Sequence, residues 1–118
     1  MEYLFKTWSE SAALLIDVAA GRVPADTVIL GGKLVNVHTR EVLHWDVAIS
    51  DGRFAYVGPN AGHCIGDKTE VLRTEGFLIP GLCDGHMHIE SGMLTPAEFT
   101  RAVIPHGTTT MFTDPHEI

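Results

Sequence analysis

The hydrophobic pattern of this chain changes near residue 77, and the change limits the folds that the chain can adopt. Before residue 77, short β-prone runs follow one another between turn residues. After it come a strand pattern, a helix pattern and a second strand pattern, which together indicate a parallel βαβ unit with a right-handed crossover. We therefore predict an α/β protein built from two different kinds of structure.

Residues 1–26 are expected to form an N-terminal helical segment, with its helix over roughly residues 8–20. Thr7 followed by Glu10 fits a capping box, in which each side chain satisfies a free amide at the start of a helix. Gly21 stands where a residue in the left-handed conformation commonly ends a helix. Both ends of the helix are thus marked in the sequence.

Residues 27–76 are expected to form a partial β-sandwich domain. Short β-prone runs alternate with turn signals, and Asp51-Gly52 lies between two of these runs. Asp-Gly in this position indicates a hairpin, because both turn residues must adopt positive φ. The runs are too few and too short to make two complete sheets, so we expect part of a sandwich that needs a partner.

Residues 77–118 are expected to contain the βαβ unit. The apolar run at 77–84 predicts a buried strand, and Thr95-Pro96 opens a helix with proline at its first position. The β-branched and aromatic run at 108–114 predicts the second strand. Polar side chains follow both strands, and the active sites of (β/α)-barrels lie at that end of their strands.

His86 and His88 are the strongest candidates for metal ligands. In an extended strand they point to the same side, about 7 Å apart along the strand, so both imidazoles can bind one divalent ion. A His-x-His pattern alone is weak evidence, and the alternative is a pair of surface or hydrogen-bonded histidines. The position of the pair, directly after a predicted buried strand, favours metal binding. Neutral imidazoles suit Zn, Mn, Fe or Ni, so the pattern does not name the ion.

Five further polar residues are candidates for the same site. Glu90 and Ser91 follow the histidine pair, where they could contact the substrate or a second metal. The alternative is that both residues lie in a solvated loop. Asp114, His116 and Glu117 follow the next predicted strand, where the alternative is an ordinary turn and loop. Two such clusters at neighbouring strand ends favour a functional site over two unrelated loops.

Composition and charge argue against several classes of partner. The net charge is −7 and no stretch concentrates Lys and Arg, so we expect no nucleic-acid binding. No apolar run approaches the ~18 residues that cross a bilayer, and the first residues lack a secretory pattern, so we expect no membrane association. The two cysteines are too few for a disulfide framework, and we expect a cytoplasmic protein.

Several segments together resemble a known family. They are LGG at 30–32, LVNV at 34–37, DGR at 51–53, PG at 80–81, DGHMHIES at 84–91, MLTP at 93–96, PHGTTT at 105–110 and DPHEI at 114–118. The PG and DGHMH segments are similar to the first barrel strand of the amidohydrolase superfamily. The longer set is similar to the adenine deaminase family within that superfamily, and it spans nearly the whole chain.

The resemblance implies a small β-sandwich domain built from both chain ends and a (β/α)8 barrel with a binuclear metal centre. The chain would hold the N-terminal part of the sandwich and the first βαβ unit of the barrel, truncated at Ile118. Mn or Fe is the implied metal, with Zn as the alternative. Members of the family convert adenine and water to hypoxanthine and ammonia, in purine salvage, through attack by a metal-bound hydroxide.

The resemblance also assigns residues by position. His86 and His88 match first-strand ligands of one metal. The residues that match active-site segments are Glu90, Ser91, Asp114, His116 and Glu117. Gly92 departs from the family, which commonly has a serine there, so a hydroxyl contact at this position is not expected.

The later barrel strands of the family would follow Ile118. Only two of the implied metal ligands precede that point, so we expect the 118-residue chain to be inactive alone and to hold metal weakly or not at all. We expect adenine as the substrate of a longer parent, and a homo-oligomer or self-association through exposed sheet edges. The alternatives are another amidohydrolase acting on a cyclic amide or amidine, and a non-catalytic sheet module that assembles with a partner chain.

Overall fold

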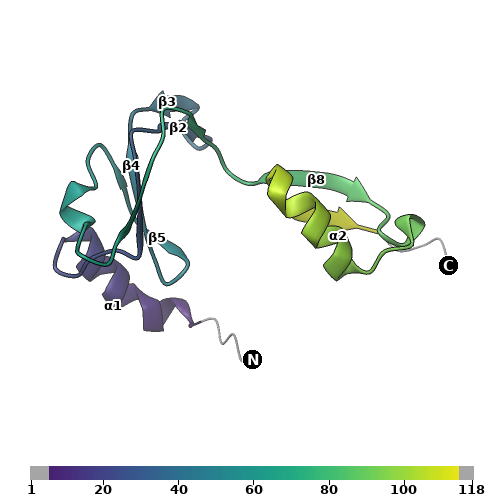
Figure 1. Ribbon diagram of the computed structural model, residues 1–118, viewed down its shortest axis with the longest axis horizontal. Coiled ribbons are helices and arrows are strands. Elements are labelled where there is room, and N and C mark those ends of the chain that lie inside the picture. Colours follow the sequence, from purple (N-terminus) through teal and green to yellow (C-terminus); the bar gives the residue numbers. More distant parts are fainter. Residues whose placement is uncertain (1–5, 115–118) are drawn as a thin grey trace. The chain divides into compact units, whose positions relative to one another are not determined.

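The structure is a computed structural model, and it describes residues 6–114 (Figure 1). The chain divides into two compact units between Ile79 and Pro80. The first unit holds one helix and seven strands, and the second holds one helix between two strands. The predicted mixed α/β class is therefore confirmed. The composite sandwich and the complete barrel remain predictions.

The helix of the first unit, α1 (Trp8–Ala19), begins and ends at the residues that the sequence marks. The Glu10 carboxylate accepts a hydrogen bond from the Thr7 amide at 2.6 Å, so the predicted capping box is formed. Beyond the helix, Gly21 has a φ of 70°, which ends the helical path without the strain that a Cβ would add. The helix packs against two strands of the neighbouring sheet, β4 (Asp46–Ser50) and β5 (Arg53–Gly58), as Figure 1 shows.

Seven strands of the first unit form two sheets. The four-stranded sheet has the order β5 (Arg53–Gly58), β4 (Asp46–Ser50), β1 (Thr27–Leu30), β6 (Glu70–Arg73). The three-stranded sheet has the order β3 (Glu41–Leu43), β2 (Lys33–Asn36), β7 (Phe77–Leu78). The β4–β5 hairpin is antiparallel, and its turn residues Asp51 and Gly52 have φ values of 53° and 65°, so the predicted Asp-Gly turn is confirmed.

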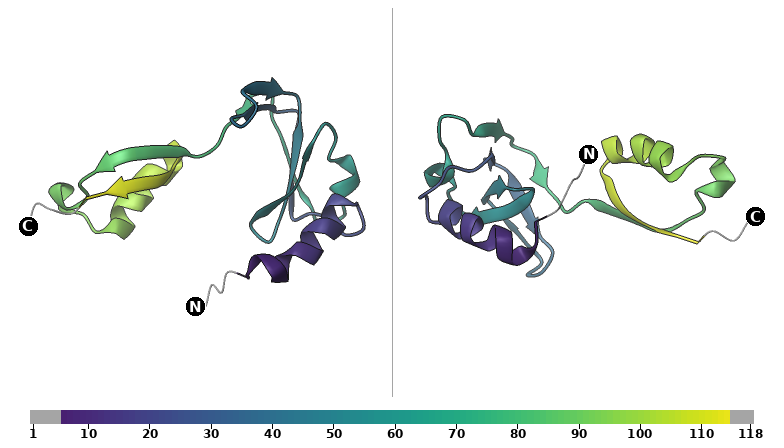
Figure 2. Two further views of the ribbon diagram at one scale, coloured as in Figure 1. Left: turned by 180° about the vertical axis from the view of Figure 1, so that it is seen from behind. Right: turned by 90° about the horizontal axis from the view of Figure 1, so that it is seen from below.

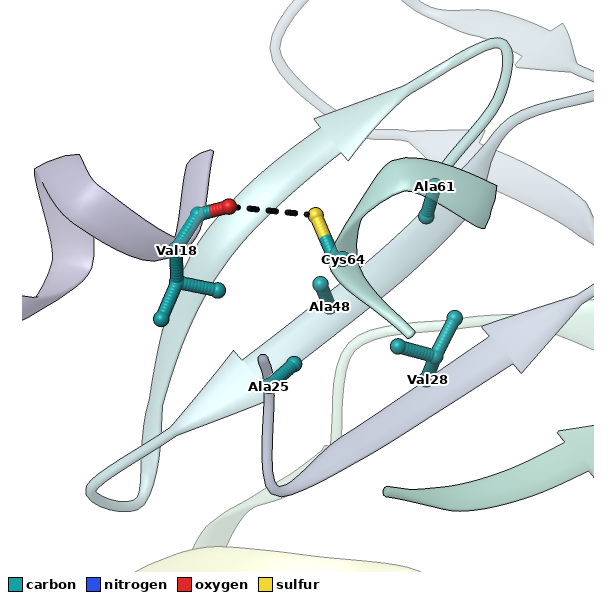
Figure 3. Close-up of a cluster of buried hydrophobic side chains, with 6 residues drawn as sticks. All are labelled: Val18, Ala25, Val28, Ala48, Ala61 and Cys64. Atoms are coloured by element: carbon teal, nitrogen blue, oxygen red, sulfur yellow. Dashed lines mark hydrogen bonds between the residues drawn. The ribbon is translucent and has the colours of Figure 1, made fainter. Parts of the chain in front are cut away.

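The core of the first unit lies where α1, the four-stranded sheet and a short 3-10 helix, η1 (Gly62–Cys64), meet (Figure 3). Its buried residues are Val18, Ala25, Val28, Ala48, Ala61 and Cys64. Small side chains dominate this set, which lets the helix approach the sheet closely. The Cys64 thiol donates a hydrogen bond to the Val18 carbonyl at 3.3 Å, so its one polar hydrogen is satisfied inside the core.

The second unit is a strand, helix, strand arrangement, in the order that the pattern change predicts. Its strands β8 (Leu82–Met87) and β9 (Thr108–Thr113) are parallel neighbours. Helix α2 (Pro96–Val103) lies beside them (Figure 2). Thr95 caps this helix by accepting a hydrogen bond from the Glu98 amide at 3.3 Å. Two short 3-10 helices, η2 (Glu90–Gly92) and η3 (Ile104–His106), complete the connections.

The prediction of one buried strand over residues 77–84 is wrong. Its first residues form β7, which pairs with β2 in the first unit, and its last residues begin β8 in the second. Pro80 lies in the break, where its missing amide removes a donor that a continuous strand would need. The side chains of β8 are exposed or half-buried, because a sheet of two strands with one helix covers little of them.

Among residues 6–114, no helix combines the length and apolar character required to cross a membrane.

Candidate functional site

The histidine pair lies at the end of β8, where the strand leaves the small parallel sheet. The His86 and His88 imidazoles face each other, with 2.8 Å between their Nε2 atoms and 4.6 Å between ring centroids. Two nitrogens that each bind one ion at about 2.0–2.1 Å are about 2.9 Å apart at a right angle and about 3.3 Å apart at the tetrahedral angle. The observed separation is close to the first of these, so a small opening of the pair fits a shared divalent ion.

Hydrogen bonds to the neighbouring strand hold the second histidine in this orientation. Nδ1 of His88 lies 2.6 Å from the main-chain oxygen of Asp114, the residue directly after β9. The amide of Asp114 in turn donates to the Met87 carbonyl at 3.3 Å. The Asp84 carboxylate accepts from the His86 amide at 3.1 Å and so supports the other end of the pair. The ends of β8 and β9 are therefore tied together at the histidines.

Glu90 and Ser91 lie in η2, immediately after the pair. One carboxylate oxygen of Glu90 is 3.6 Å from Nδ1 of His88, and both side chains are about three-quarters buried, at 24% and 22% exposed. This distance is too long for a hydrogen bond. Ser91 is exposed. Of the two candidates in this segment, Glu90 thus lies beside the pair.

The second predicted cluster is only partly described. Asp114 reaches the histidine pair through its main-chain oxygen. His116 and Glu117 lie outside the described residues. Within residues 6–114, no group of three or more His, Cys, Asp or Glu side chains is arranged to hold a metal ion. The described part of the chain supplies a two-imidazole half-site, and the assignment of the pair as metal ligands stays a prediction.

Two groups beside the pair are absent from the candidates chosen from the sequence. The Asp84 side chain supports the His86 amide, and its position two residues before the pair is a signal that could have identified it. The main-chain oxygen of Asp114 is the other, and a carbonyl leaves no signature in a sequence. Only the pairing of β8 with β9 brings it to His88.

Comparison with known proteins finds similarity to several named enzymes over nearly the whole chain. No protein-family model matches it. The chain is 71% identical over 116 residues to "Adenine deaminase 1" of Jannaschia sp. (strain CCS1), covering 97% of this chain and 20% of that protein. It is 71% identical over 116 residues to "Adenine deaminase" of Ruegeria sp. (strain TM1040), covering 97% of this chain and 19% of the relative. "Adenine deaminase" of Moorella thermoacetica is 55% identical over 105 residues, which cover 88% of this chain and 17% of that protein.

All three of these relatives are named adenine deaminase. The matches extend over nearly the whole chain, so the resemblance indicated by the sequence motifs is confirmed. The chain spans about a fifth of the length of the curated relatives that it matches.

Proposed function

We propose that the chain supplies the first part of the metal and substrate site of an adenine deaminase, which converts adenine and water to hypoxanthine and ammonia. The observation that carries the proposal is the approach of the His86 and His88 Nε2 atoms to 2.8 Å at the end of a parallel strand. The identity of up to 71% to proteins named adenine deaminase supports the same assignment.

His86 and His88 would hold one divalent ion of a binuclear centre through their Nε2 atoms, with Mn or Fe preferred and Zn as the alternative. Such an ion lowers the pKa of a bound water towards neutrality and so supplies a nucleophile at physiological pH. Two imidazoles leave most of the coordination shell to water, so firm binding needs further donors from beyond the described residues. We therefore expect the 118-residue chain alone to bind metal weakly.

The polar residues around the pair would act on the substrate and its protons. Deamination requires that a proton reach the leaving amino group, and a carboxylate beside the reacting atoms can carry it. The position of Glu90 beside His88 supports such a role for its carboxylate. Ser91, Asp114, His116 and Glu117 are the remaining candidates for contacts to the purine ring. We also propose a cytoplasmic location, with adenine as the small-molecule partner.

A chimera tests the proposal. The 116 residues of the Jannaschia adenine deaminase that match this chain are replaced by this chain, and conversion of adenine to hypoxanthine is measured by chromatography with and without added Mn²⁺. We expect metal-dependent activity within about tenfold of the parent enzyme. His88→Ala in the chimera is expected to reduce kcat/KM at least 100-fold, as second-shell losses alone already cost 10–100-fold at metal sites.

The matched control is His38→Ala, which changes an exposed histidine of the first unit and should leave activity unchanged. The isolated 118-residue chain is assayed in parallel and should convert no adenine. A folded chimera that lacks activity, or one whose activity survives His88→Ala, contradicts the proposed function.

A further inference from the structure

The hydrogen bond between His88 and the end of β9 determines where the imidazole proton sits. Nδ1 of His88 is 2.6 Å from the main-chain oxygen of Asp114, a short hydrogen bond. A carbonyl oxygen can only accept, so Nδ1 must carry the hydrogen. A neutral imidazole has one N–H, and the Nε2 atom of His88 is therefore left with a lone pair.

The same lone pair faces the other histidine. The Nε2 atom of His86 is 2.8 Å from that of His88, so in the metal-free chain His86 is the donor of this second hydrogen bond. The two bonds form one directional chain from His86 through His88 to the Asp114 oxygen. A shared metal ion would lie beside the line that joins the two Nε2 atoms, about 2.0–2.1 Å from each nitrogen.

Strand pairing, and not a side chain, places the accepting oxygen. Met87 pairs with Thr113 in the parallel sheet, and the Asp114 amide donates to the Met87 carbonyl at 3.3 Å. These contacts fix the peptide that follows β9 against the end of β8. The rival acceptor, the Glu90 carboxylate, lies 3.6 Å from Nδ1 and is the weaker partner.

We propose that the main-chain oxygen of Asp114 is a positioning group that fixes His88 as the Nδ1–H tautomer and aims its Nε2 lone pair at the metal position. The inference rests on the proposed function in taking the pair as ligands. In this proposal the backbone, and not a side chain, orients the His88 ring for metal binding. The proposal names no positioning group for His86, so the two histidines differ in how their tautomers are fixed before metal binds.

The test is nuclear magnetic resonance of the metal-free 118-residue chain labelled with ¹⁵N-histidine. At about pH 8, above the usual histidine pKa of ~6.5, long-range ¹H–¹⁵N correlations distinguish the two neutral tautomers of each ring. We expect His88 as a single Nδ1–H population. An Nε2–H tautomer at His88, or a mixture of comparable populations, overturns the proposal.

Three variants identify the group that fixes the tautomer. Glu90→Gln removes the rival carboxylate charge, and Asp114→Ala removes a side chain while keeping the main-chain oxygen. His86→Ala removes the other hydrogen-bond partner of the ring. The Nδ1–H signature of His88 should persist in all three, and its loss in any folded variant shows that the altered side chain fixes it instead.

The measurement contains neither metal nor adenine, so its outcome is separate from that of the chimera. An Nε2–H tautomer at His88 together with an active chimera refutes the positioning role and leaves the proposed function standing. An Nδ1–H tautomer at His88 together with an inactive chimera supports the positioning role of the Asp114 oxygen and contradicts the proposed function.

Discussion

At the scale of single residues, Asp51 connects the hairpin turn to helix α1. Its carboxylate accepts a hydrogen bond from Ser11 at 2.7 Å and lies 3.3 Å from the Lys6 ammonium. The Ser11 hydroxyl is the main cause that lowers the pKa of Asp51 below its usual value, with the Lys6 charge acting in the same direction. Because Ser11 is 1% exposed, the contact joins a buried helix position to a surface turn.

This contact predicts how the stability of the first unit depends on pH. A carboxyl group whose pKa is lower in the folded state stabilises the fold above its unfolded pKa, ~3.9 for Asp, and this stabilisation is lost as pH falls through the folded pKa. Urea denaturation followed by tryptophan fluorescence should therefore show a loss of stability below about pH 4. Glu10, whose pKa is lowered by the Thr7 amide, contributes in the same direction.

Ser11→Ala should reduce this pH dependence, because it removes the largest cause of the shift at Asp51. Ala13→Ser, at an exposed position of the same helix, is the matched control and should leave the slope unchanged. Equal slopes in the two variants would contradict the assignment of the shift to Ser11.

At the scale of elements, the N-cap of α2 is a point where one side chain supports a whole helix. Replacing Thr95 by alanine removes the acceptor for the Glu98 amide and should destabilise the second unit by about 1 kcal/mol. Hydrogen exchange of the α2 amides measures the loss. Thr100→Ala, which changes a threonine inside the same helix, is the control, and a cost as large as that of Thr95→Ala would show that the cap is not responsible.

The elements that the sequence predicts correctly are those with local signals. Thr7 and Glu10 mark the start of α1, and Asp51-Gly52 marks the β4–β5 hairpin, because each pattern acts within a few residues. The same holds for the approach of His86 and His88, which follows from the two-residue period of a strand. Local chemistry is sufficient in each case.

The features that the sequence does not predict depend on distant partners. The sequence does not mark strand β3, because its turn has Arg40 at a φ of 61° with no glycine to signal the reversal. The stability of this strand comes from pairing with β2. The split between β7 and β8 follows from which sheet each half pairs with. The oxygen that contacts His88 belongs to the backbone, so no residue type signals it.

At the scale of the whole molecule, the 118-residue chain presents large apolar side chains to solvent. In the second unit Leu82 is 50% exposed, Ile104 55% and Phe112 63%. Exposed apolar side chains beside a two-stranded sheet favour association, because contact with a second copy removes them from water. We therefore propose that the isolated chain self-associates.

Sedimentation velocity over a range of concentrations measures this association. Phe112→Ser should weaken it several-fold, since about 25 cal/mol of driving force is lost for each Å² of apolar surface that no longer becomes buried. Thr110→Ser, at another exposed position of the same strand, should have little effect. A wild-type chain that stays monomeric at all concentrations would contradict the expectation.

The parallel pairing within the first unit also sets an order of events during folding. The β4–β5 hairpin closes through a two-residue turn, whereas β1 meets β6 only when Thr27 and Glu70, 43 residues apart in sequence, come together. Closing the longer loop costs more chain entropy, so the hairpin forms early and β6 adds late. β7, which follows β6 and pairs with β2 in the same parallel sense, joins at the same stage. The last strands of the first unit to find their places are thus those nearest to the histidine pair in sequence.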